Sequence, residues 1–338
     1  MEVIKQSVGI DIAKNTFTSC VAVIASNQKV RLKRAKTFDN NVKGFSSFMK
    51  WVIEQTDSSI KTCFVMEPTG VYHENLAYWL YALGKEVCIP LSNKVKNYAK
   101  SLNIRSKTDD IDAKVIALLG AERALEPWKL CSPNLVDLRQ LTREYESLQD
   151  ERSKIGSKIH NIEHAHNVNE RIKNRLYKRL ELIDLQVQQT VKDMNRLLKK
   201  DKILGKKIDN ILTIKGVGLI TAVTIVAETQ GFSLINNRKQ LVSYAGYDVV
   251  ERQSGTSIKG KTRISKKGNH HIRRILHFPA LVAATHSPSI KTFYNRVNEG
   301  KSSKKIGCVA VQKKLLVMMY SIWKNNTTYS EDYTGNSN

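Results

Sequence analysis

The sequence predicts an α/β domain at the N-terminus, then a long helical connector, then a mostly α-helical domain. Three observations support this architecture. Short β-rich segments alternate with helical patterns over the first 125 or so residues. Glycine then almost disappears, and apolar residues recur at spacings of three and four. Beyond that stretch, apolar helical segments return together with glycines and many basic residues. We expect boundaries at 1–130, 131–205 and 206–325, with a disordered tail over 326–338.

The N-terminal elements follow a recognisable order. SVGIDIA and FTSCVAVIA are β-rich and separated by KNT, a hairpin signal, and VRLKRAKTF (Val30 to Phe38) alternates as a third strand does. A helical pattern, the strand in KTCFVMEPTG, a helix closed by Gly84 and the strand EVCIPL come next. A further helix contains KTDDIDAKVIALL. Three antiparallel strands followed by alternating helix and strand predict an RNase H-like fold.

The connector carries two runs of apolar residues at coiled-coil spacing. The first runs from Leu138 to Ile162 and the second from Ile172 to Met194, with a weak stretch at HAHNVNE between them. We expect two long helices, arranged as a hairpin or as a spacer arm. Such helices usually provide dimer contacts or a rigid link rather than chemistry.

The C-terminal domain contains a segment that resembles a helix–hairpin–helix. ILTIKGVGLITAVTIVAE (Ile211 to Glu228) places Gly-Val-Gly between two apolar helical runs. A glycine turn of this kind can present backbone N–H groups to a phosphate. An ordinary tight turn between helices explains the pattern equally well.

A basic region follows, and it holds no acidic residue between Lys259 and Arg274. Glycines at 255, 260 and 268 would let its backbone approach a phosphate chain closely. His270 and His271 are further candidates for phosphate contacts. The residues that we expect to bind nucleic acid are Lys259, Lys261, Arg263, Lys266, Lys267, Arg273 and Arg274.

The overall charge favours a polyanionic partner. The 338 residues include 55 Lys and Arg against 31 Asp and Glu, a formal net charge of +24. Phosphate neutralisation by such residues supplies most non-specific affinity for nucleic acid. No apolar run approaches the roughly 18 residues that a membrane span needs, so we expect no membrane partner. The five cysteines form no CxxC pair, which favours a reducing cytosol.

Acidic residues are scarce here, and four of them suggest a metal site. Asp109 and Asp112 are spaced i, i+3, so on a helix they share a face. Helix capping is the simpler explanation for Asp109, Asp110 and Asp112. However, Asp11 is a lone acid in a buried-strand pattern, and Glu67 lies at a strand end, where sites form in α/β sheets.

Together, the acids on three separate segments favour metal binding over capping. Carboxylates from separated segments can hold two divalent ions, the usual apparatus for displacement at a phosphodiester. Mg²⁺ is the expected ion because of its availability and its preference for oxygen ligands, with Mn²⁺ as the alternative.

Four stretches resemble the DEDD transposases of the insertion-sequence one-ten family, to which the Piv-type DNA invertases are related. They are GIDIAKNTF, EPTGVYHENLAYWL, SKTDDIDAKVIALL and SGTSIKGKTRISKKGNHHIRRIL. The resemblance implies a RuvC-like N-terminal domain, that of a Holliday-junction nuclease with an RNase H fold, and a C-terminal transposase domain. It places the family's catalytic, metal-binding tetrad on Asp11, Glu67, Asp109 and Asp112. Asp110 is then an intervening acid at the start of the helix.

The resemblance also implies a nucleophile and partners. Ser254 matches the serine that attacks the scissile phosphate in this family, although spacing alone does not separate it from Ser257 and Ser265. Family members form dimers and higher homo-oligomers, and a structured bridge RNA guides them to target and donor DNA. We therefore expect a DNA recombinase in the bacterial cytoplasm, associated with the nucleoid.

Other functions fit the sequence less well. A RuvC-like structure-specific nuclease would use water as its nucleophile, so Ser254 would be dispensable. An actin-like or hexokinase-like ATPase is suggested by VGIDIAKNT, but Ala13 and Lys14 stand where that fold prefers glycine. A non-enzymatic nucleic-acid scaffold would leave the acids on strands unexplained.

Overall fold

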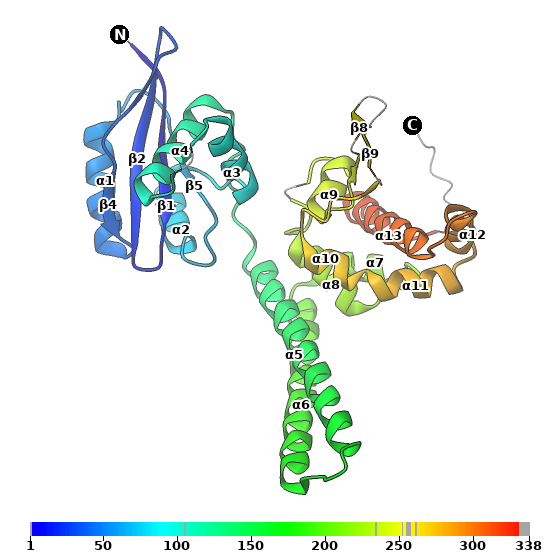
Figure 1. The fold of residues 1–338 in the computed structure, drawn as a ribbon. Coiled ribbons are helices and arrows are strands. Elements are labelled where there is room, and N and C mark those ends of the chain that lie inside the picture. Colours follow the sequence, from blue (N-terminus) through cyan, green and yellow to red (C-terminus); the bar gives the residue numbers. More distant parts are fainter. Residues whose placement is uncertain are drawn as a thin grey trace. The chain divides into compact units, whose positions relative to one another are not determined.

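The chain folds into two compact units, Met1–Leu130 and Cys131–Asn338 (Figure 1). The computed structural model describes residues 2–104, 106–233, 235–251, 253–254, 258–260 and 262–330. For residues 253, 254, 258 and 259 it describes the backbone alone.

The first unit is built on one mixed sheet. Its strands are β1 (Val3–Ile12), β2 (Thr16–Ala25), β3 (Val30–Leu32), β4 (Lys36–Asp39), β5 (Thr62–Met66) and β6 (Glu86–Cys88). The order is β3-β2-β1-β5-β6, with β4 also paired to β2. β1, β2 and β3 are antiparallel to their neighbours, whereas β5 is parallel to β1 and β6 to β5. This order confirms the RNase H-like fold that the sequence predicts.

Helices cover both faces of this sheet. Helices α1 (Val42–Gln55) and α2 (Glu74–Ala82) pack on the face that carries Val8, Ile10 and Phe64. Helices α3 (Ser92–Ser101) and α4 (Asp109–Glu122) pack on the opposite face, against Val65 and Cys88. Since side chains alternate along a strand, the residues between Val8, Ile10 and Ile12 face α4.

The predicted third strand is two strands, which corrects our expectation for Val30 to Phe38. β3 pairs Leu32 with Ala22, and β4 pairs Lys36 with Ser19, so this edge has one residue more than β2 between the two pairings. The extra residue makes a β-bulge, which interrupts the ladder and bends the strand. Lys33 anchors the bend because its ammonium donates to the Gln55 carbonyl at 2.5 Å.

Helix α4 lies unusually close to β1. A Cβ built on Gly9 would lie 2.6 Å from the Cα of Ala117 and would overlap the backbone of Ala113. Gly120, one helical turn further along α4, would likewise overlap the side chains of Ser7 and Val65. Glycine on both surfaces therefore sets the separation of helix and strand, and with it the position of the first turn of α4.

The second unit begins with two long antiparallel helices, α5 (Pro133–Glu163) and α6 (Glu170–Lys200) (Figure 1). Polar pairs join them at two levels: Asn134 donates to Asp201 at 2.7 Å, and Arg152 pairs with Asp184 at 2.6 Å. The two long helices are thus present as a hairpin. Their coiled-coil geometry stays a prediction.

The rest of the second unit is mostly helical, with two short strand pairs that the sequence did not predict. β7 (Val249–Val250) pairs with β10 (Arg263–Ile264), and β8 (Gln253–Ser254) pairs with β9 (Ile258–Lys259). The helices are α7 (Lys202–Leu212), α8 (Leu219–Glu228), α9 (Arg238–Ala245), α10 (His270–Ile275), α11 (His277–His286), α12 (Pro288–Asn298) and α13 (Lys305–Asn325).

Helix α13 corrects our expectation about membrane-length segments. Among the described residues it is the one helix long and apolar enough, by length and composition, to cross a membrane. More than half of the apolar stretch of α13 is buried, and Val311, Leu315 and Met319 lie fully inside the core of the unit. This burial is what the core helix of a folded domain shows, so its length and composition are weak evidence for a membrane span.

The Gly-Val-Gly turn between α7 and α8 packs onto α11. Gly216 has a φ of +90°, and a Cβ there would lie 2.9 Å from the Ala283 nitrogen and 3.0 Å from the Pro279 oxygen. Gly218 caps α8, and a Cβ built on it would meet no atom within 4 Å. The phosphate-binding role of this helix–hairpin–helix-like segment stays a prediction.

The start of the predicted tail contacts the domain. The backbone N–H of Tyr329 donates to the Thr213 hydroxyl at 2.8 Å. Residues 331–338 lie outside the described residues.

Candidate active site

Asp11 lies near the C-terminal end of β1, and its side chain points toward α4. Its neighbours Ile10 and Ile12 are buried against α1 and α2, so alternation places the Asp11 carboxylate on the opposite face. Across the sheet, Asp11 pairs with Thr18 of β2. The carboxylate is half-buried.

Glu67 reaches the same edge of the sheet from β5. The parallel register pairs Ile10 with Met66, so Asp11 and Glu67 are the next residues at the same level. Glu67 is half-buried and is followed by Pro68, whose missing N–H ends the strand. Parallel strands thus bring together two acids that lie far apart in the sequence.

The first turn of α4 supplies the other acids, and Thr108 caps it. The Thr108 hydroxyl accepts a hydrogen bond from the Ile111 N–H at 3.3 Å. Because Thr108 provides the side-chain cap, capping does not explain why three aspartates follow it. Asp109 is exposed and Asp112 is half-buried. The charge of Asp110 contributes to raising the pKa of Cys20 on β2, where burial is the larger cause.

The electrostatics of Asp11 show that the four carboxylates form one group. Burial raises the pKa of Asp11 to about 6, assisted by the negative charges of Asp112, Asp109 and Glu67 and opposed by Lys107. Burial also raises the pKa of Asp112, and Asp109 adds to this effect. Partly desolvated carboxylates repel one another, and a bound divalent cation would relieve that repulsion.

The donor set suits a hard divalent ion, although the side chains stand apart. All four predicted ligands would offer carboxylate oxygens, which Mg²⁺ and Mn²⁺ prefer. Among the described residues, no three of these carboxylates bring ligand atoms within 4.8 Å of one another. A shared ion therefore requires some of these side chains to change rotamer.

The predicted nucleophile lies in the short strands of the second unit. The backbone of Ser254 pairs with Ile258 across β8 and β9, while its side chain lies outside the described residues. Ser257 lies outside them altogether. Ser265 is described: its hydroxyl donates to the Asp248 carboxylate at 2.5 Å and accepts from the Lys267 N–H at 3.2 Å. Ser265 is thus held in a turn.

The predicted basic residues separate into two groups. Arg263, Lys266 and Lys267 are exposed on β10 and the turn after it. The side chain of Lys259 and all of Lys261 lie outside the described residues. The exposed cations remain candidates for nucleic-acid contacts.

Arg273 and Arg274, by contrast, are engaged inside the protein. Arg273 donates to the Ala245 carbonyl at 2.7 Å. Arg274 pairs with Glu146 at 3.0 Å and also with Asp150, both on α5. These contacts join α10 to α9 and to α5, which favours a structural role over the phosphate contact that their charge suggests.

Sequence reasoning missed a buried acid at the end of α8. Glu228 is 2% exposed and accepts from Arg143 at 2.8 Å and from Asn269 at 2.6 Å. Burial alone would raise the pKa of Glu228, but these hydrogen bonds and the charge of Arg143 outweigh it and lower the pKa. Beside it, His271 contacts Glu146, so it is not a free phosphate ligand. The sequence signal for Glu228 was a single acid at the end of an apolar run, much as Asp11 is a single acid within one.

Comparisons with known proteins agree on one family. Residues 8–162 match the DEDD transposase model of the IS110 group, and residues 208–295 match the model for transposases of the IS116/IS110/IS902 family. Together the two matches cover more than two thirds of the chain. The sequence is also 29% identical to the pilin gene-inverting protein of Moraxella bovis, covering 97% of this chain and 98% of that protein.

Further relatives are similar. The pilin gene-inverting protein of Moraxella lacunata is 28% identical over the same shares of both chains. An IS110 protein of Streptomyces coelicolor is 22% identical over 35% of this chain and 29% of its own length. Among solved structures, RuvC of T. thermophilus in complex with a Holliday junction substrate matches 36% of this chain and 99% of its own, at 11% identity and a TM-score of 0.29. The strand order, not this low score, identifies the fold.

Proposed function

Because this chain belongs to the IS110 family of transposases, we propose that it cuts and exchanges DNA strands at a divalent metal held by Asp11, Glu67, Asp109 and Asp112. The observation that carries the proposal is the convergence of these carboxylates, three of which raise the pKa of the fourth. Mg²⁺ is the ion we propose, with Mn²⁺ as the alternative.

The four carboxylates would act by holding a divalent cation next to the scissile phosphate. A bound divalent ion neutralises charge that develops on the phosphate oxygens during displacement. Asp11 lies on β1 and Glu67 directly follows β5, so both would be held at one edge of the sheet beside the phosphate. Asp109 and Asp112 sit on the helix that Gly9 and Gly120 hold against the sheet, so they fix the opposite side.

We propose that Ser254 supplies the nucleophile. Its hydroxyl oxygen would form a bond to phosphorus while the bond from phosphorus to one deoxyribose oxygen breaks. The products are a phosphoserine link and a free DNA hydroxyl, so the energy of the phosphodiester is kept for rejoining. A serine hydroxyl is a weak nucleophile at neutral pH and needs an activating environment. The basic residues of the surrounding segment support this placement.

We propose DNA and a structured bridge RNA as partners, within a homodimer or homotetramer. The net charge of +24 and the exposed Arg263, Lys266 and Lys267 support binding to more than one phosphate chain. Residues 131–205 would connect the RuvC-like domain to a transposase domain at 206–325. The pilin-inverting relatives suggest that the outcome can be inversion as well as transposition.

A covalent-adduct experiment tests the serine. The full-length protein would be incubated with its flanking RNA, Mg²⁺ and labelled DNA carrying the element junction, then separated under denaturing conditions. We expect a protein–DNA adduct that Ser254→Ala abolishes and that the matched variant Ser265→Ala retains. Mass spectrometry of the adduct peptide should place the link at residue 254. Cleavage without any adduct, undiminished in Ser254→Ala, would instead identify a nuclease that uses water.

A further inference from the structure

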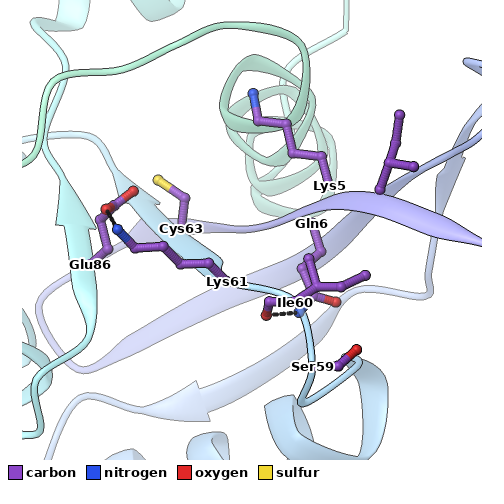
Figure 2. Close-up of a pocket in the computed structure, with 8 residues that line it drawn as sticks. Lys5, Gln6, Ser59, Ile60, Lys61, Cys63 and Glu86 are labelled. Atoms are coloured by element: carbon purple, nitrogen blue, oxygen red, sulfur yellow. Dashed lines mark hydrogen bonds and ion pairs between the residues drawn. The ribbon is translucent and has the colours of Figure 1, made fainter.

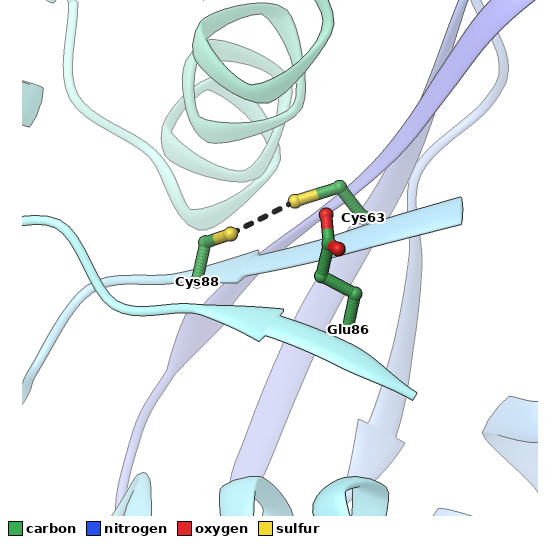
Figure 3. Close-up of side chains that lie close together, drawn as sticks. All are labelled: Cys63, Glu86 and Cys88. Atoms are coloured by element: carbon green, nitrogen blue, oxygen red, sulfur yellow. Dashed lines mark hydrogen bonds between the residues drawn. The ribbon is translucent and has the colours of Figure 1, made fainter. Parts of the chain in front are cut away.

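Two thiols and a carboxylate meet on the neighbouring strands β5 and β6 (Figure 3). Cys63 lies at the start of β5 and Cys88 at the end of the neighbouring strand β6, and their sulfur atoms are 3.1 Å apart. Glu86 is the direct register partner of Cys63. One ligand atom from each of the three residues lies within 4.8 Å of the others.

The contact between the two sulfur atoms favours the thiolate form of Cys88. The Cys63 thiol donates to Cys88, which lowers the pKa of Cys88 and raises that of Cys63. Burial and the charge of Glu86 oppose this lowering of the Cys88 pKa, and the positive charges of Lys61 and Lys5 add to it. A thiolate is the form of cysteine that binds metals. A bound divalent cation would itself offset most of the negative charge of two thiolates and a carboxylate.

An open cavity leads to this cluster. It has a volume of about 480 Å³, and Cys63, Glu86, Lys5 and Lys61 are among the residues that line it (Figure 2). Lys61 pairs with Glu86 at 2.5 Å, but the Lys61 side chain is 78% exposed. Exposed ion pairs contribute little to stability, so Lys61 can swing away and free the Glu86 carboxylate. The cavity also admits the water that a fourth coordination position would need.

We propose that Cys63, Cys88 and Glu86 bind a zinc ion, with water from the cavity as the fourth ligand. Zinc takes thiolate and carboxylate ligands in tetrahedral geometry with Zn–S distances of about 2.3 Å, which places two sulfurs about 3.8 Å apart. The observed separation of 3.1 Å needs only a small opening. Binding displaces both thiol protons to solvent.

The proposed ion has a structural role. It joins β5 to β6 at the end of β5 opposite the one from which Glu67 follows. It would hold the register of β5 and β6, in which Cys63 pairs with Glu86. The inference is independent of the metal proposed for the tetrad, whose ligands are all oxygens.

Cobalt substitution tests the site, because thiolate ligands give Co²⁺ an intense ultraviolet charge-transfer absorption that oxygen ligands do not. The reduced full-length protein would be titrated with Co²⁺, then with Zn²⁺ to displace it. We expect one Co²⁺ per chain with thiolate absorption, lost in Cys63→Ser and in Cys88→Ser. Cys131→Ser, a half-buried cysteine of the other unit, is the matched control and should retain it.

Glu86→Gln keeps the test meaningful if the serine variants fail to fold. This variant leaves both thiols in place, and we expect its Co²⁺ affinity to fall by about tenfold or more. The proposal is overturned if the reduced wild-type protein shows no thiolate absorption, or if Cys63→Ser retains it. It is equally overturned if protein isolated from reducing cytoplasm carries a Cys63–Cys88 disulfide in place of zinc.

Discussion

Replacing Asp11 by asparagine should lower the rate of DNA strand cleavage by about a thousandfold or more. The change preserves shape but removes one anionic ligand from the strand at the centre of the site. Metal stabilisation of a phosphoryl transition state contributes several kcal/mol, and each 1.36 kcal/mol corresponds to tenfold in rate. Asparagine also removes the half-buried carboxylate whose pKa burial and its neighbours raise, so the folded protein should be no less stable. Single-turnover cleavage of labelled junction DNA, alongside thermal unfolding, measures both effects.

Asp110→Asn is the matched control for this result. Asp110 lies in the same helical turn as Asp109 and Asp112 but is outside the proposed tetrad, and its charge acts on Cys20. Its replacement should leave the cleavage rate within a factor of about three, which corresponds to less than 1 kcal/mol. Equal losses in the two variants would mean that general negative charge at α4, and not a specific ligand set, supports cleavage.

Gly9→Ala should destabilise the first unit by about 3 kcal/mol or more. Overpacking a core typically costs about 1–3 kcal/mol, and here the added methyl group meets backbone atoms of α4 that cannot rotate aside. Separation of α4 from β1 would also move Asp109 and Asp112 away from Asp11, so cleavage should fall as well. Urea unfolding followed by tryptophan fluorescence reports mainly on this unit, which holds Trp51, Trp79 and Trp128, whereas Trp323 lies in the second unit.

Gly156→Ala provides the opposite expectation. Gly156 lies inside α5, and a Cβ there would meet no atom within 4 Å. Alanine should therefore stabilise the helix by up to about 1 kcal/mol.

If Gly9→Ala unfolds at the same urea concentration as wild type, the close approach of α4 to β1 does not govern the position of the site.

The sequence predicts much of the site because the position of each acid depends on short-range patterns in a single strand or helix. Asp11 and Glu67 are polar residues in apolar strand patterns, and parallel register then requires them to lie at one level. The i, i+3 spacing of Asp109 and Asp112 similarly needs only a helix. By contrast, the bulge that divides Val30 to Phe38 depends on the Gln55 carbonyl, which alternation of side chains does not reveal.

Long-range partners explain the other differences between prediction and structure. Arg274 is basic in a basic segment, so it resembles a phosphate ligand until Glu146 and Asp150, more than a hundred positions earlier, are found beside it. The close packing of Gly9 on Ala117 is equally invisible in a linear pattern. Whether Ser254 attacks DNA is a question of chemistry, which the experiments above address directly.

Exchanging a carboxylate of the tetrad for a thiolate tests metal ligation most directly. The Asp112→Cys variant should be inactive in Mg²⁺, which binds thiolate poorly, and should regain strand cleavage in Mn²⁺, a transition metal that accepts sulfur more readily. Asp110→Cys, its neighbour outside the group, should cleave in either ion. Rescue confined to Asp112→Cys would establish that this residue contacts the metal during cleavage. Full activity of Asp112→Cys in Mg²⁺, or equal inactivity in both ions beside an active Asp110→Cys, would contradict a metal centre at the tetrad.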